Sequence, residues 1–344
     1  MQQNLFRLID SRKARDLLFR IEEFATESQL VEDLLGTTSI AAPHIFREGR
    51  MVPAQGRIGQ WRPWLRLVFV LLAASISFHA QERPYFVTYS HEMEEPGNLE
   101  IEMFSAIGKP PGGNRFLGST TEFEYGATAW WTTEFYLDGQ TTWHDSTIFA
   151  GYRWENRFRP LLREHRINPV IYIEFENTSA DKALREVVGH DGRDDFLDTN
   201  ADARADKQRE IELKLILGSN FRGWNLSENF IAEKSLKNEP WEFGYALAAS
   251  RPLKLAASSH KCAFCAEKFM AGVEMYGGLG DWHSFGTRLT SHYLGPTVNW
   301  SAPNGITLSF SPQFGLNDYS IPRLYRFGIQ YEIEQVVNRF RRGE

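Results

Sequence analysis

Long hydrophobic runs are missing from this sequence, and several other features are scarce. No stretch of about 18 apolar residues occurs among the 344 residues, which excludes an ordinary transmembrane helix but permits short, half-polar transmembrane strands. Only two cysteines are present, Cys262 and Cys265, too few for a disulfide framework. Positive charge is not in excess, because the formal net charge is -6, so a phosphate-rich nucleic-acid partner is not expected.

An export signal is predicted within residues 51–81. Arg57, Arg62 and Arg66 precede an apolar run over 67–78 that ends in small residues, which is the order found in secretory signal peptides. Cleavage could follow Ser77, Ala80 or Gln81. The alternative for this run is a buried core helix.

Residues 1–50 stand before that signal and show helical spacing of apolar residues between Asn4 and Leu35. A signal peptide belongs at the N-terminus, and Met51 would place it there. One hypothesis is that translation starts at Met51, so that residues 1–50 are not in the native product. The alternative is a small cytoplasmic helical segment before a signal anchor.

The segment 324–334 alternates in character at every position. Tyr325, Phe327, Ile329, Tyr331 and Ile333 share one face of a strand, with polar residues and glycine on the other. Similar runs recur from residue 97 onward, giving twelve expected strands. The expected organisation is therefore a lead-in on the periplasmic side at 82–96, a barrel at 97–334 and a charged C-terminal tail at 335–344, which contains Arg339, Arg341 and Arg342.

The expected fold class is all-β: a transmembrane antiparallel up-and-down β-barrel of about 12 strands. An even strand number and a periplasmic N-terminus place these loops outside: 108–117, 139–145, 178–208, 237–239, 280–290 and 317–322. A soluble β-sandwich would also alternate with period two. Strands of about 9–12 residues and aromatic residues near strand ends favour the membrane. These aromatic residues include Trp130, Trp143, Trp154, Trp224, Trp241, Trp282 and Trp300.

The segments His292–Trp300, Gly315–Asp318 and Leu324–Glu332 resemble the C-terminal strands of Gram-negative outer-membrane β-barrel proteins. They are similar in particular to the transporter-annotated barrels grouped with phenol-degradation-pathway outer-membrane proteins. The resemblance implies location in the cell outer membrane and a transport role. It also implies contact with membrane lipids, lipopolysaccharide and the outer-membrane assembly machinery. The charged tail after Glu334 departs from the pattern, because such barrels usually end on an aromatic residue of the last strand.

Carboxylates dominate the polar faces of the expected strands. The residues predicted to line the lumen are Glu100, Glu102, Glu122, Glu124, Glu134, Glu174, Glu176, Glu212, Lys214, Arg326 and Glu332, with Arg153 as a further inward cation. An acidic lumen would favour cations in a passive channel for an ion or small-molecule substrate. The alternative is a non-conducting structural or surface-interaction barrel, its lumen filled by salt bridges between strands.

A calcium site is suggested by Asp198, Asn200, Asp202 and Asp206, which occupy positions 1, 3, 5 and 9 of an EF-hand-like loop. Ala203 stands where the turn glycine belongs and Arg209 where the bidentate Glu belongs, so a solvated acidic loop is the competing interpretation.

Cys262 and Cys265 form a lone C-x-x-C, for which a local disulfide is expected in an oxidising periplasm, with free thiols as the alternative. No cofactor is expected, and an enzyme is not the favoured function. A lipid-modifying barrel enzyme would need a lipid-facing Ser with His. The neighbouring pairs at 90–91, 283–284 and 291–292 point to opposite strand faces.

Overall fold

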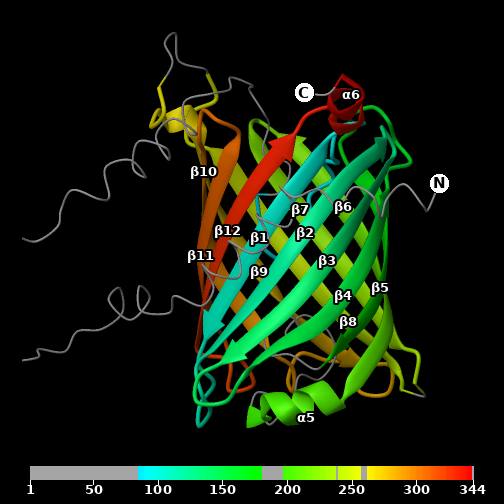
Figure 1. The fold of residues 1–344 in the computed structure, drawn as a ribbon, viewed down its shortest axis with the longest axis vertical. Helices are drawn as coiled ribbons and strands as arrows, with labels where there is room; N and C mark the ends of the chain where they lie inside the picture. Colours follow the sequence, from blue (N-terminus) through cyan, green and yellow to red (C-terminus); the bar gives the residue numbers. More distant parts are fainter. Residues whose placement is uncertain (1–83, 180–196, 238, 257–261, 343–344) are drawn as a thin grey trace, which may run out of the picture. The chain divides into compact units, whose positions relative to one another are not determined.

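The computed structural model describes residues 84–179, 197–237, 239–256 and 262–342 (Figure 1). All of them belong to the compact unit that spans Gln60–Glu344. The predicted segment 1–50 and the predicted signal peptide at 51–81 lie outside the described residues. Part of the long connection predicted at 178–208 also lies outside them.

Twelve antiparallel strands close into a barrel, and each strand pairs with its neighbours in the sequence while β1 pairs with β12. The strands are β1 Leu99–Gly108, β2 Phe116–Thr128, β3 Trp131–Thr142, β4 Thr147–Phe158, β5 Asn168–Ser179, β6 Lys207–Phe221, β7 Trp224–Ser235, β8 Trp241–Pro252, β9 Phe269–Asp281, β10 His292–Ser301, β11 Ile306–Gly315 and β12 Arg323–Ile333. The closing register pairs Leu99 with Ile333 and Gly108 with Leu324. The predicted fold class and strand number are confirmed.

The connections alternate between two ends of this barrel. One end, the loop end, carries the six connections predicted to face outward, together with α5 (Asn200–Ala205). The other, the terminal end, is where β1 begins, β12 ends and α6 (Val336–Arg342) follows; Figure 1 shows α6 and α5 at opposite ends. Which end faces the cell exterior stays a prediction.

The distribution of side chains is the reverse of that in a soluble β-sandwich. On β12, Phe327 and Ile329 are 44% and 51% exposed, whereas Gln330, the residue after Ile329, is 2% exposed. The same order holds on β3, where Phe135 and Leu137 are exposed. Leaving one large apolar side chain in water costs about 1.5–3 kcal/mol, so an exterior band of such residues calls for an apolar surrounding. This surface is suited to lipid, with the polar faces turned into the barrel.

Aromatic side chains gather near both ends of the barrel. Trp130 and Trp131 stack with Phe158 at the terminal end, and Phe243 contacts Trp282 and Phe285 at the loop end. Indole and phenol rings have an apolar body with a polar edge, which suits them to a membrane–water boundary. The two groups therefore fit the aromatic belts of a membrane-spanning barrel.

None of the helices in the described part of the chain is long and apolar enough to cross a membrane.

Candidate functional site in the barrel interior

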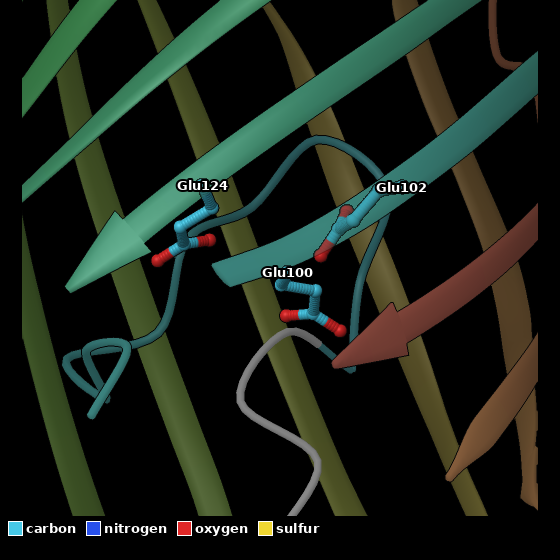
Figure 2. Close-up of side chains that lie close together, drawn as sticks. All are labelled: Glu100, Glu102 and Glu124. Atoms are coloured by element: carbon cyan, nitrogen blue, oxygen red, sulfur yellow. The ribbon is translucent and has the colours of Figure 1, made fainter. Parts of the chain in front are cut away.

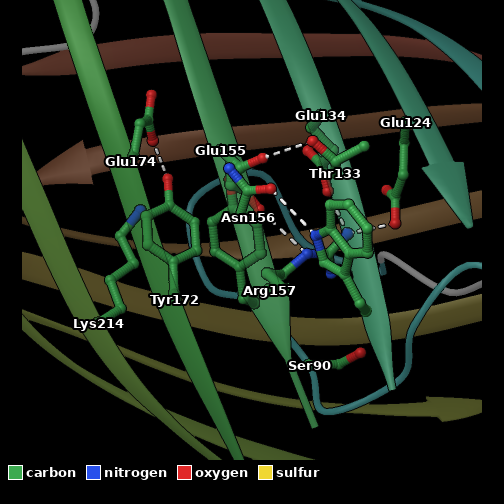
Figure 3. A network of polar contacts seen from close by, with 12 residues as sticks. Ser90, Glu124, Thr133, Glu134, Glu155, Asn156, Arg157, Tyr172, Glu174 and Lys214 are labelled. Carbon is green, nitrogen blue, oxygen red and sulfur yellow. Dashed lines mark hydrogen bonds and ion pairs between the residues drawn. The ribbon is translucent and has the colours of Figure 1, made fainter. Parts of the chain in front are cut away.

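A chain segment runs through the interior of the barrel. Residues 84–98, which we call the plug segment, precede β1, and most of their side chains are buried. Thr88 and His91 are no more than 1% exposed, and Ser90, labelled in Figure 3, lies inside the ring of strands. The sequence predicts that 82–96 lead into the barrel from the periplasmic side. The described part of that segment does precede β1, but it occupies the bore.

Side chains of two strands hold the backbone at the centre of the plug segment. The Glu274 carboxylate on β9 accepts N–H groups from Val87 at 2.7 Å, Thr88 at 2.6 Å and Phe86 at 3.4 Å. On β7, Asn229 accepts the N–H of Tyr89 at 2.6 Å and donates to its carbonyl at 2.9 Å. Backbone groups that a strand would pair in a sheet are thus satisfied by wall side chains, as buried N–H and C=O groups require.

Tyr89 extends from the plug segment to the opposite side of the bore. Its hydroxyl donates to Glu155 on β4 at 2.8 Å and lies 3.0 Å from the Tyr136 hydroxyl on β3. The ammonium of Lys214 on β6 sits 4.6 Å from the centre of its ring. The ring packs against Tyr172 in an edge-on contact, with centroids 5.1 Å apart. The contacts of this one side chain therefore reach four strands.

The beginning and the middle of the plug segment are fixed to other parts of the wall near the terminal end. The hydroxyl of Tyr85 donates to Ser250 on β8 at 2.9 Å, and the Pro84 carbonyl accepts from Asn299 on β10 at 2.9 Å. His91 lies 3.2 Å from the Glu164 carboxylate in the β4–β5 connection. Taken together, the contacts involve strands on every side of the barrel, so the segment crosses the bore rather than lining one wall.

A network of charges covers one side of the interior. Arg157 on β4 pairs with Glu124 on β2, Glu134 on β3 and Glu155 on its own strand (Figure 3). All four side chains are almost fully buried. Removing charges from water is costly unless they are paired and hydrogen-bonded, and this arrangement supplies the pairing across three strands.

Two further cations, Arg153 and Lys214, extend this network of charges to β6. Arg153 donates to Asp138 at 2.9 Å and to Glu174 at 3.0 Å. Lys214 pairs with Glu212 at 2.7 Å and also lies over the ring of Tyr172. The cations predicted to point inward thus take part in salt bridges, Arg153 with carboxylates on both neighbouring strands and Lys214 with one on its own strand.

A small apolar cluster lies in the interior beyond the plug segment. It includes Ala106, Phe116 and Leu324 at the loop end of their strands, Ile321 in the β11–β12 connection, and the rings of Tyr276 and Tyr293. Val87 of the plug segment packs against this cluster. The bore is therefore occupied at two levels.

Most of the carboxylates predicted to line the lumen are buried inside the barrel. Those under 9% exposed are Glu102, Glu122, Glu124, Glu134, Glu174 and Glu212, while Glu100, Glu176 and Glu332 are partly buried. Two groups bring carboxylate oxygens within 4.8 Å of one another: Glu100 with Glu102 and Glu124 (Figure 2), and Glu174 with Glu176 and Glu212. Arg326 is buried and donates to the Tyr276 hydroxyl at 3.0 Å.

The segment with the suggested calcium spacing forms a helix instead of a loop. Asn200 begins α5, and its amide is buried against the β3–β4 hairpin, where it donates to Ser146 and accepts from Thr142. Asp202 takes part in the cap with Thr199, and Asp206 pairs with Lys237. Asp198 precedes this helix and Asp206 follows it. Calcium binding by the four residues stays a prediction.

Cys262 and Cys265 are joined by a disulfide in the β8–β9 connection at the terminal end. Beside it, Phe264 stacks on Trp300 with ring centroids 5.0 Å apart, and the Trp300 indole donates to the Ala263 carbonyl. The bridge closes a short loop over the aromatic belt and stands apart from the interior.

The position most like a catalytic pair is His292 with Thr290. The Nε2 atom of His292 lies 2.9 Å from the Thr290 hydroxyl, but also 2.9 Å from the Thr287 carbonyl. A carbonyl only accepts, so Nε2 carries the proton and cannot take one from Thr290. The other ring nitrogen lies 2.9 Å from the Tyr245 hydroxyl. His292 therefore fixes the loop before β10.

Sequence reasoning missed Arg157 and the plug segment. Arg157 is not among the inward cations predicted from the sequence, but β4 continues to Phe158 and carries Arg157 inward. Continued alternation over 154–158 could have shown this. The plug segment offered no such signal, because its backbone partners are side chains and it has no two-faced pattern.

No model of a known protein family matches this sequence. A search of curated proteins likewise found no match. Among solved structures, the COG4313 outer membrane channel from Pseudomonas putida F1 is 12% identical, with a TM-score of 0.44 over 70% of this chain and 97% of that one. The NanC porin is 9% identical, with a TM-score of 0.42 over 68% of this chain and 100% of that one. The KdgM porin is 8% identical, with a TM-score of 0.40 over 67% of this chain and 98% of that one. At these values the likeness is one of barrel architecture and says nothing of what this protein does.

Proposed function

We propose that the protein is a passive outer-membrane channel whose bore is closed by the plug segment in the conformation described. The observation that carries the proposal is a polar barrel interior crossed by a segment that non-covalent contacts hold in place. Glu274, Asn229 and Tyr89 supply several of its hydrogen bonds. None of these contacts belongs to the strand ladders that close the barrel, so the segment can leave without breaking the barrel's own hydrogen bonds.

The charge inside the barrel supports a preference for cations. Buried carboxylates on the strands include Glu102, Glu122, Glu124, Glu134, Glu155, Glu174, Glu210, Glu212 and Glu274. The cations among them are fewer, namely Arg153, Arg157, Lys214 and Arg326. A narrow bore with an excess of one charge concentrates ions of the opposite sign. The substrate class that fits is therefore an ion or a small cationic solute.

The second candidate is a non-conducting structural or surface-interaction barrel. The apolar cluster around Tyr276 and Tyr293 favours it, since the cluster fills part of the bore with side chains of the strands themselves. The salt bridges of Arg157 across β2, β3 and β4 also fit a purely structural interior. A lipid-modifying enzyme receives no support from the His292 geometry.

Location in the outer membrane follows from the same proposal. The apolar exterior and the two aromatic groups suit a bilayer, so membrane lipids and lipopolysaccharide are the proposed surroundings. Insertion by the outer-membrane assembly machinery and membership of the phenol-degradation-pathway barrels are further proposals. They rest on the sequence resemblance alone.

Recording single-channel currents in planar bilayers under a salt gradient tests the function. We expect a channel that is closed for most of the time and opens in steps, with a reversal potential of the sign given by cation selectivity. Anion selectivity would overturn the role of the carboxylates. A folded barrel that never passes current, even after residues 84–96 are removed, would favour the non-conducting alternative.

A further inference from the structure

The chain continues beyond the last strand, and this continuation touches the point where the plug segment leaves the bore. Residues 335–342, which we call the tail, follow β12 and include α6. The plug segment ends at Pro96, Gly97 and Asn98, directly before β1. Since β1 is paired with β2 and β12 along its length, a movement of the plug segment must turn about these three residues.

Each of the three hinge residues accepts a hydrogen bond from the tail. The side-chain amide of Gln335 donates to the Pro96 carbonyl at 2.8 Å, and its backbone N–H donates to the Asn98 side chain at 2.9 Å. The N–H of Val336 donates to the Gly97 carbonyl at 2.9 Å. The Asn98 amide also donates to Glu332 at the end of β12.

Packing restricts the same hinge. Gly97 has a φ of 91°, a conformation that side chains rarely adopt, and Gln335 has a φ of 49°. A Cβ placed on Gly97 would lie 3.1 Å from Oε1 of Gln335, so the tail fills the space beside the hinge. Rotation about Gly97 therefore requires Gln335 to move first.

We propose that the tail is a clamp that keeps the plug segment in the bore by holding its hinge at residues 96–98. This regulation belongs to the closed channel proposed above and rests on that function for its physiological meaning. The proposal also gives the charged tail a role, which is to supply hydrogen-bond donors to the hinge of the plug segment. Release of the tail would free the hinge and permit opening.

The test is the accessibility of a thiol on the plug segment in the full chain, refolded and kept oxidised. Thr88→Cys is the reporter, because Thr88 is fully buried and its hydroxyl has no hydrogen-bond partner among the described residues. The native cysteines are bridged and do not react. Gln335→Ala removes the bond to Pro96 and the side chain beside Gly97. A chain ending at Glu334 removes the whole clamp. Val337→Ser is the matched control, since Val337 is an exposed residue of the same tail.

We expect Gln335→Ala to raise the labelling rate roughly tenfold, which corresponds to losing one or two hydrogen bonds, and the shortened chain to raise it further. Val337→Ser should label at the parent's rate. Unchanged labelling in both clamp variants would overturn the proposal, and so would equal acceleration by Val337→Ser. Faster labelling without any gain in current would uphold the clamp and count against the channel function.

Discussion

Glu274 shows how one carboxylate can fix a chain segment inside a barrel. It accepts three successive backbone N–H groups, from Phe86, Val87 and Thr88, and a further contact from Gln313 at 3.3 Å. Hydrogen bonds to a charged acceptor contribute about 1.5–3 kcal/mol, roughly twice those between neutral groups. The negative charge of the Glu274 carboxylate suits this position, because the successive N–H groups all present their positive ends to it.

Glu274→Gln should therefore loosen the plug segment while leaving the barrel folded. We expect the Thr88→Cys reporter to be labelled roughly tenfold faster, because a neutral amide accepts these bonds less strongly. Ser309→Ala is the control, since Ser309 is a buried interior hydroxyl without a hydrogen-bond partner among the described residues. Equal labelling rates in the two variants would show that Glu274 does not hold the segment.

Glu92 makes the seating of the plug segment dependent on pH. Burial raises the pKa of its carboxyl above the ordinary value of 4.5, partly offset by the hydrogen bond from Asn220 and by His91 and Arg159, while Glu164 adds to the rise. A seated segment therefore holds this proton more tightly than a released one. Seating is favoured at low pH and weakens as the pH rises through the raised pKa.

The open fraction of the channel should thus increase as the pH rises above the ordinary carboxyl pKa of 4.5 towards the raised pKa of Glu92. Glu92→Gln should flatten that increase, because it keeps a neutral group at all pH values. Currents recorded over a pH series from both chains check this. A pH dependence that survives unchanged in Glu92→Gln would assign it to another group.

At the level of elements, alternation identified the strands because lipid on one side and a polar interior on the other impose it at every residue. On β12 this gave the exposed Ile329 and the buried Gln330 directly from the sequence. Alternation does not reveal what fills the interior. The contacts of Tyr89 with Glu155 and Lys214 join residues far apart in the chain, and no local pattern encodes them. The sequence likewise does not reveal that a helix begins at Asn200, since the buried amide of this residue depends on the β3–β4 hairpin.

Arg157 joins three strands through buried carboxylates. Replacing it with Met leaves Glu124, Glu134 and Glu155 without their shared cation. Breaking a buried pair by removing one partner costs about 3–5 kcal/mol, so Arg157→Met should lower the unfolding free energy by about that amount. Urea unfolding followed by tryptophan fluorescence measures it. Lys237→Ala, which removes the exposed pair with Asp206, should have little effect. Similar midpoints for both variants would contradict the structural weight given to this network.

The outward face of β12 should tolerate charge poorly in a bilayer. Ile329→Arg is expected to destabilise the inserted barrel by about 2–4 kcal/mol if the residue lies near the midplane. In detergent, where the charged head finds water more easily, the cost should be smaller. Comparison of unfolding in lipid vesicles and in micelles checks this. An equal effect in both would indicate that this face does not meet the acyl chains.

At the level of the whole molecule, the barrel combines a hydrogen-bonded wall with an interior segment. That segment is held by wall side chains, by the tail and, at Gly97 and Asn98, by backbone hydrogen bonds to Gly126 of β2. Closure of β1 on β12 gives the wall no open edge, so the wall does not depend on what lies inside. The plug segment can then differ in stability from the barrel around it. This separation distinguishes a closed channel from a structural barrel whose interior is part of its fold.

Comparing bilayer currents of the complete chain with those of a chain lacking residues 84–96 tests this claim most directly. The shortened barrel should insert and fold like the parent, and it should conduct steadily and with cation selectivity where the parent is closed for most of the time. If the two chains give the same current, or if neither conducts, the plug segment does not close a channel.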